Sequence, residues 1–195
     1  NVRFFEPNLI LSSWYLLWLE KNNKDFLKYQ LAIDLKKSIE DIRLGFRKSY
    51  TPLVNTALKE WQIEVCDKDH DQIFEEFRLL HLEAAGKETR TRDSWAIQKE
   101  QIKNKEAFLV TVRDEGELIG AGFFNYTRDM GMYSVAAYKR ELFDRPIGHA
   151  VQMIAIEKLK ELGCKTYYLG QKATSGLSTE KEISISHSVS YTHLR

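Results

Sequence analysis

The sequence predicts an α/β fold of the α+β type, in which a mixed sheet carries helices on both faces. Three apolar segments separated by short polar turns predict an antiparallel meander over residues 107–138, because short turns join antiparallel neighbours. An amphipathic helix over residues 146–162 and a strand over residues 165–169 follow. A strand–helix–strand order normally makes the two strands parallel. The expected sheet is therefore an antiparallel meander joined to a parallel unit.

Hydrophobic periodicity predicts further strands and helices before the meander. Ser38 is the expected N-cap of the first helix, since its hydroxyl can accept a bond from the first turn and two acidic residues follow it. Pro52 is expected to end or kink that helix, and Gly86 to stop the most clearly amphipathic one. The other expected elements are strands at 28–35 and 61–66 and helices at 53–60, 71–85 and 94–102.

The composition is that of an ordinary globular protein, with 43% hydrophobic and 29% charged residues among 195. A net charge of +1 supplies no argument for nucleic acid, and we expect no DNA partner. Cys66 and Cys164 have no CxxC partner or suitably spaced His, so we expect buried free thiols and no metal. The apolar run at 9–19 is shorter than the roughly 20 residues that a membrane span needs. A cytoplasmic location is expected.

Both ends of the chain lead to expectations about its organisation. It begins at Asn1 directly in patterned sequence, so we expect residues 1–35 to be the remnant of a preceding unit or the join to it. The main domain is expected at 36–187. Residues 188–195 follow no earlier pattern and resemble a translated library adapter, so we leave them out of the fold as a non-native tail.

The junction between the third meander strand and the following helix carries the sequence R-x-x-G-x-A. Backbone N–H groups in the first turn of a helix lack helical acceptors and attract an anion. Gly148 would let that backbone approach a pyrophosphate closely, Ala150 keeps the next position small, and Arg145 adds a positive charge. The alternative is an ordinary helix start, with Pro146 in its favoured place and a glycine that serves packing.

The order of meander, motif, helix and strand resembles the GNAT superfamily of acyltransferases. There a Q/R-x-x-G-x-G/A motif holds the pyrophosphate of acyl-CoA, and the matching positions here are Arg145, Gly148 and Ala150. The resemblance implies a GNAT-like fold, neighbouring strands that part around the acyl thioester, and residues 135–138 lining the gap. It also implies acyl-CoA as the co-substrate, with acetyl-CoA as the first expectation.

Further segments resemble the FemAB-like group of this superfamily. That group includes aminoacyl-tRNA-dependent peptidoglycan transferases and acyltransferases encoded with envelope and surface-glycan genes. Its full-length members carry two GNAT-like halves, so the resemblance implies that most of the first half is missing here. The family pattern breaks after residue 187, which implies that the second half is incomplete. The matching segments are FRKSY at 46–50, HLEAAGK at 81–87, TRTRDSW at 89–95, RELFDRPIGH at 140–149 and EKEISIS at 180–186.

Acylation of an amine requires a base for the amine proton, donors for the oxyanion and a site that aligns both substrates. His149, beside the phosphate motif, is a candidate phosphate ligand or acid–base group, although it could also only pack or cap the helix start. Glu180 is a candidate base, with a surface charge run as the alternative.

Basic and aromatic side chains elsewhere could bind an anionic acceptor, or could belong to solvated loops and helix faces. His81, on an apolar helix face, is interpreted as a core histidine. The predicted substrate-binding residues are Lys48, Tyr50, Arg90, Arg92, Trp95 and Lys181.

These patterns favour an N-acyltransferase that moves an acyl group from acyl-CoA to an amino group of a cell-envelope sugar or peptide. By the resemblance, the protein would be of bacterial type and could work near the inner membrane face. One alternative uses aminoacyl-tRNA as the donor, and predicts a continuous basic face near Arg47, Lys48, Arg90 and Arg92. Another is a non-catalytic module that binds a glycan or protein, which would be favoured by a filled gap at Gly148.

Overall fold

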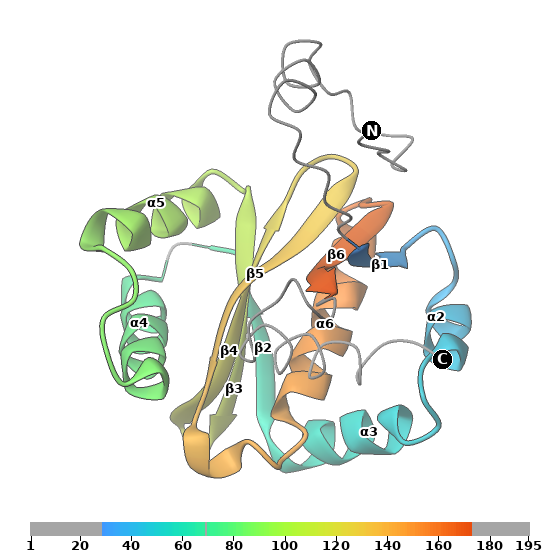
Figure 1. Cartoon of the computed structure of the whole chain (residues 1–195), viewed down its shortest axis with the longest axis horizontal. Coiled ribbons are helices and arrows are strands. Elements are labelled where there is room, and N and C mark those ends of the chain that lie inside the picture. The colour runs from blue at the N-terminus through green and yellow to red at the C-terminus, as the bar shows by residue number, and fades with distance from the viewer. Residues whose placement is uncertain (1–28, 69, 173–195) are drawn as a thin grey trace, which may run out of the picture.

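The computed structural model describes residues 29–68 and 70–172, which form a six-stranded mixed sheet with helices on both faces (Figure 1). The strand order is β1-β6-β5-β4-β3-β2, and β5 with β6 is the parallel pair among antiparallel neighbours. The predicted fold class is confirmed. The strands are β1 Tyr29–Asp34, β2 Gln62–Cys66, β3 Ala107–Asp114, β4 Glu117–Tyr126, β5 Met130–Tyr138 and β6 Thr166–Lys172.

The two faces of the sheet are covered by different helices (Figure 1). On one face α6 crosses β2 to β5 and packs against α3, with α2 beyond. On the other face α4 packs on β4 and β5, and α5 packs on β3. The helices are α2 Ile39–Gly45, α3 Tyr50–Glu60, α4 Asp71–Ala85, α5 Arg92–Lys103 and α6 Ile147–Glu161, with a 3₁₀ turn, η1 Arg140–Leu142, before α6.

The expectation for Pro52 is wrong. Helix α2 already ends at Gly45, and Pro52 lies in the first turn of α3, which begins at Tyr50. Proline is tolerated there because a first-turn N–H needs no helical acceptor. The Ser38 cap is confirmed, since its Oγ accepts from the Asp41 N–H at 3.0 Å. Gly86 ends α4 with φ of +69°, which is the left-handed region.

Helix α6 packs tightly on β4, where glycines leave space for its side chains. A Cβ at Gly120 would lie 2.6 Å from Ile147 Cγ2, and one at Gly122 would lie 2.8 Å from Val151 Cγ1. Six further residues of α6 are buried, so the helix is covered on most sides. This close packing fixes where the first turn of α6 stands relative to the end of β5.

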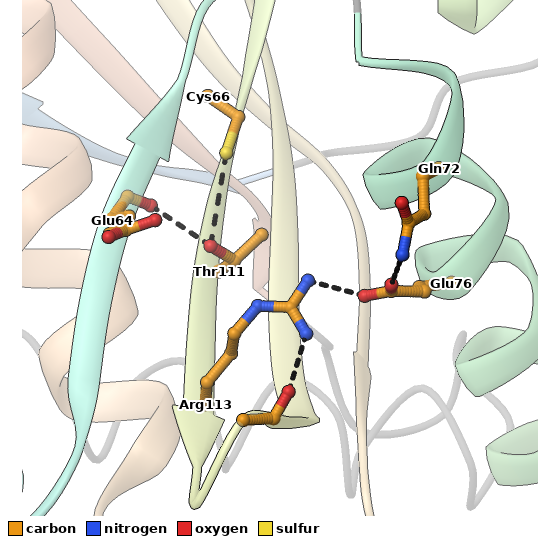
Figure 2. A network of polar contacts seen from close by, with 7 residues as sticks. Glu64, Cys66, Gln72, Glu76, Thr111 and Arg113 are labelled. Atoms are coloured by element: carbon orange, nitrogen blue, oxygen red, sulfur yellow. Dashed lines mark hydrogen bonds and ion pairs between the residues drawn. The ribbon is translucent and has the colours of Figure 1, made fainter.

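On the opposite face, ionic and hydrogen bonds fasten α4 to the sheet (Figure 2). Arg113 of β3 pairs with Glu76 of α4 and donates to the Gly116 carbonyl at 2.9 Å, while Gln72 donates to Glu76 at 3.2 Å. Cys66 and Cys164 are buried free thiols, as predicted.

Candidate functional site

The parallel strands β5 and β6 stay together over a short stretch and then part. They pair at Met130↔Thr166, Gly131↔Tyr167 and Met132↔Tyr168. At the next position β5 contains a β-bulge, because Tyr133 faces Phe124 and Val135 faces Phe123, which leaves Ser134 as an extra residue. A bulge bends its strand, so β5 diverges from β6 at this point. In the part of the chain that the structure describes, no pairing between β5 and β6 is found beyond Met132 and Tyr168.

Tyrosine side chains pack together in the core where β5 and β6 stop pairing. The Tyr133 and Tyr138 hydroxyls lie 3.3 Å apart, and the Tyr167 hydroxyl donates to Gln152 of α6. Burial raises the pKa of Tyr133, Tyr138 and Tyr167 above the usual phenol value, so all three are neutral donors at pH 7. Tyr138 belongs to the range 135–138 that the family resemblance implied, whereas Tyr133 and Tyr167 were not predicted. The sequence could have indicated these residues, because tyrosines are frequent on two strands that were predicted to be neighbours.

The first turn of α6 presents backbone donors beside these tyrosines. The N–H groups of His149 and Ala150 both donate to the Pro146 carbonyl. Within the described residues, the N–H groups of Ile147 and Gly148 have no hydrogen-bond acceptor. Gly148 borders Tyr138, since a Cβ there would lie 3.7 Å from the Tyr138 hydroxyl oxygen. Unpaired N–H groups at a helix start form a favourable environment for an anion.

Helix α3 supports this turn from the side. The buried Tyr50 hydroxyl donates to the His149 carbonyl at 3.0 Å, and the two rings lie 5.1 Å apart. Burial raises the pKa of Tyr50 and lowers that of His149. The His149 imidazole is therefore neutral at pH 7 and able to accept a proton.

Arg145 already has partners within the protein. Its guanidinium forms an ion pair with Glu60, the last residue of α3, and lies 5.4 Å above the Trp61 ring. Both charged side chains remain exposed by more than a third, so a ligand can reach them. Any phosphate bound by Arg145 would compete with the Glu60 carboxylate, a partner that the sequence pattern did not reveal.

The remaining predicted residues lie in separate places. Trp95 is buried against Phe74, Phe77 and His81, and Arg90 lies 5.9 Å above its ring. An open hollow of about 530 Å³ is lined by Glu88, Thr89, Arg90, Thr91 and Arg92.

The exposed Lys48, between α2 and α3, lies on the α6 side of the sheet, while the hollow lies beside α5 on the other side (Figure 1). Lys48 and the arginines of the hollow therefore do not form the continuous basic face that the aminoacyl-tRNA alternative predicts.

Arg140 of η1 donates to the Ala84 carbonyl at 2.8 Å, which brings the end of α4 next to the segment before α6.

Two predicted residues, Glu180 and Lys181, lie outside the described residues. In residues 29–68 and 70–172 there is no group of three His, Cys, Asp or Glu side chains that could hold a metal ion. None of the helices in that part of the chain is long and apolar enough to cross a membrane.

Comparison with known proteins decides the fold. No family model matches the sequence, and no curated protein matches it either. Among solved structures, FemX is similar with a TM-score of 0.62 at 14% identity, over 85% of this chain and 62% of its own. The chain has a FemAB-like fold.

Two other solved structures share this FemAB-like fold. L-PGS from Bacillus licheniformis has a TM-score of 0.60 at 17% identity, over 91% of this chain and 57% of its own. The C-terminal DUF2156 domain of a protein assigned as lysylphosphatidylglycerol synthetase from Agrobacterium fabrum has a TM-score of 0.63 at 13% identity, over 84% of this chain and 53% of its own. The chain thus spans between 53% and 62% of the lengths of these three structures.

Proposed function

We propose that this chain carries the donor-binding half of an N-acyltransferase that moves an acyl group from acyl-CoA to an amine of a cell-envelope sugar or peptide. The observation that carries the proposal is the coincidence of two features. The pairing of β5 with β6 ends at Met132 and Tyr168, and Tyr138 at the end of β5 borders Gly148 at the start of α6, where two N–H groups have no acceptor among the described residues. We infer that an extended donor lies along β5 beyond this point, and the unpaired N–H groups suit its anionic arm.

The chemistry that these groups support is attack of a neutral amine on the thioester carbonyl. A C–N bond forms, the C–S bond breaks and the amine proton must be removed. His149 is neutral and sits at the helix start, which makes it a candidate to accept that proton, and Glu180 remains a second candidate. The neutral phenols of Tyr133 and Tyr138 are suited to donate hydrogen bonds to developing negative charge.

The acceptor is proposed to bind near the hollow beside α5. Arg90 and Arg92 supply positive charge there, and the buried Trp95 ring forms the platform beneath Arg90. An acceptor with a phosphate or carboxylate would match this charge.

Calorimetric titration of the 195-residue chain with CoA tests the proposal. Arg145→Ala should weaken binding by about threefold to tenfold, a range that allows for the exposure of the guanidinium. Glu60→Gln should strengthen binding, because it removes the carboxylate that competes for Arg145. Arg128→Ala, in the turn at the far end of β5, is the matched control and should leave affinity unchanged. Absence of CoA binding to the unaltered chain would overturn the acyl-CoA proposal and favour a non-catalytic binding module.

An aminoacyl-tRNA donor is the second candidate. The fold likeness to FemX and to the lysylphosphatidylglycerol synthetase domain favours it, whereas the separation of Lys48 from the arginines of the hollow counts against it. Binding of a charged tRNA that weakens steeply as salt rises, without competition from CoA, would support this donor in place of acyl-CoA.

A further inference from the structure

The bulge in β5 decides which of its side chains face α6. Successive strand residues point to opposite faces, so Tyr133 and Tyr138, five positions apart, would face opposite ways in a regular strand. The extra residue at Ser134 reverses this alternation. Val135 and Ala137 consequently pack in the core on the α4 side, while both tyrosines pack in the core on the α6 side. Their 3.3 Å hydroxyl contact exists because of the bulge.

A chain of side-chain hydrogen bonds holds the bulged residue in place. Ser134 Oγ donates to Asn125 Oδ1 at 2.6 Å, and Asn125 Nδ2 donates to Gln101 Oε1 at 3.0 Å. Asn125 lies on the neighbouring strand β4, and Gln101 lies on α5. All three side chains are partly buried, so water competes only weakly for these bonds.

We propose that Asn125 is a positioning residue, which together with Gln101 pins the Ser134 bulge and thereby sets the point at which β5 separates from β6. The link to donor binding rests on the proposed function, whereas the pinning of the bulge does not. Because Gln101 belongs to the helix that begins at the hollow beside Arg92, the same bonds connect the proposed acceptor side of the sheet with the donor side.

Hydrogen–deuterium exchange of the 195-residue chain tests the pinning. In Asn125→Leu and in the milder Gln101→Met, amides of residues 133–136 should exchange about fivefold faster, as expected for the loss of one hydrogen bond. Amides of β2 should keep the exchange rates that they have in the unaltered chain. Ser134→Ala should reproduce the effect, and Ser134→Thr, which keeps the hydroxyl, should restore slow exchange. Gln72→Met is the matched control, because it removes a similar glutamine bond from α4.

Unchanged exchange at residues 133–136 in both Gln101→Met and Ser134→Ala would overturn the proposal, whether or not the chain binds CoA. Uniformly faster exchange in all strands would equally overturn it, because the bonds would then serve general stability. If CoA binds, its affinity should fall in the same variants in step with the exchange rates. If exchange responds while CoA fails to bind the unaltered chain, the pinning stands and the acyl-CoA function fails.

Discussion

Gly148→Ala separates the stability of the fold from the binding of the donor. The added Cβ would lie 3.7 Å from Tyr138 Cζ and from its hydroxyl oxygen, which is an ordinary contact distance. Gly148 is the second residue of α6, where alanine is the better helix former by at most about 1 kcal/mol. The variant should therefore unfold at the same temperature as the unaltered chain or up to about 4 °C higher.

The same methyl group would stand where a pyrophosphate is proposed to approach the helix start. Loss of one charge-assisted hydrogen bond predicts a decrease in CoA affinity of about tenfold or more. Thermal unfolding followed by circular dichroism, with CoA titration on the same sample, measures both quantities. Unaltered affinity would refute the placement of the anion at Gly148, and a marked fall in unfolding temperature would refute the steric reasoning.

Three further predictions concern the surroundings of α6. Gly120→Ala should destabilise the protein by about 1–3 kcal/mol in urea unfolding, because its Cβ would clash with Ile147; a neutral effect would contradict the close packing. Tyr50→Phe should cost about 1 kcal/mol by removing its hydrogen bond to the His149 carbonyl, and an unchanged urea midpoint would count against that bond. Burial lowers the folded-state pKa of both His149 and His81, so the unfolded chain binds more protons in mild acid. The free energy of unfolding should therefore fall as pH drops below about 6.5, and His149→Gln should flatten this dependence.

Local patterns were sufficient to predict most of the elements. Helix α4 was predicted with its observed bounds, because apolar spacing and a left-handed Gly86 define it without help from the rest of the chain. The predicted start of α3 was wrong. Proline is tolerated in the first turn of a helix but disrupts the interior, and Pro52 lies in the first turn of α3. Whether a proline lies in the first turn depends on the neighbouring turns of the chain, which hydrophobic periodicity does not describe.

The candidate site depends more heavily on contacts between distant segments. The motif at residues 145–150 was visible in the sequence, but the Glu60 partner of Arg145 lies 85 positions away. The bulge at Ser134 was equally hidden, because it is defined only by the register between β4 and β5. The predicted roles of Glu180 and Lys181, and the domain boundary at residue 35, stay predictions; β1, which lies before that boundary, pairs with β6 in the same sheet.

Two interactions connect α3 with the start of α6, the Tyr50–His149 hydrogen bond and the Glu60–Arg145 ion pair, and they affect the order of folding. Tyr50 reaches His149 across 99 positions, so the chain must close a long loop before the helix start gains its support. The meander, joined by short turns, can form earlier because its contacts are local. The first turn of α6 should therefore be among the last parts of the domain to become rigid. A fragment that began after α3 would keep the whole motif and still present an unsupported helix end.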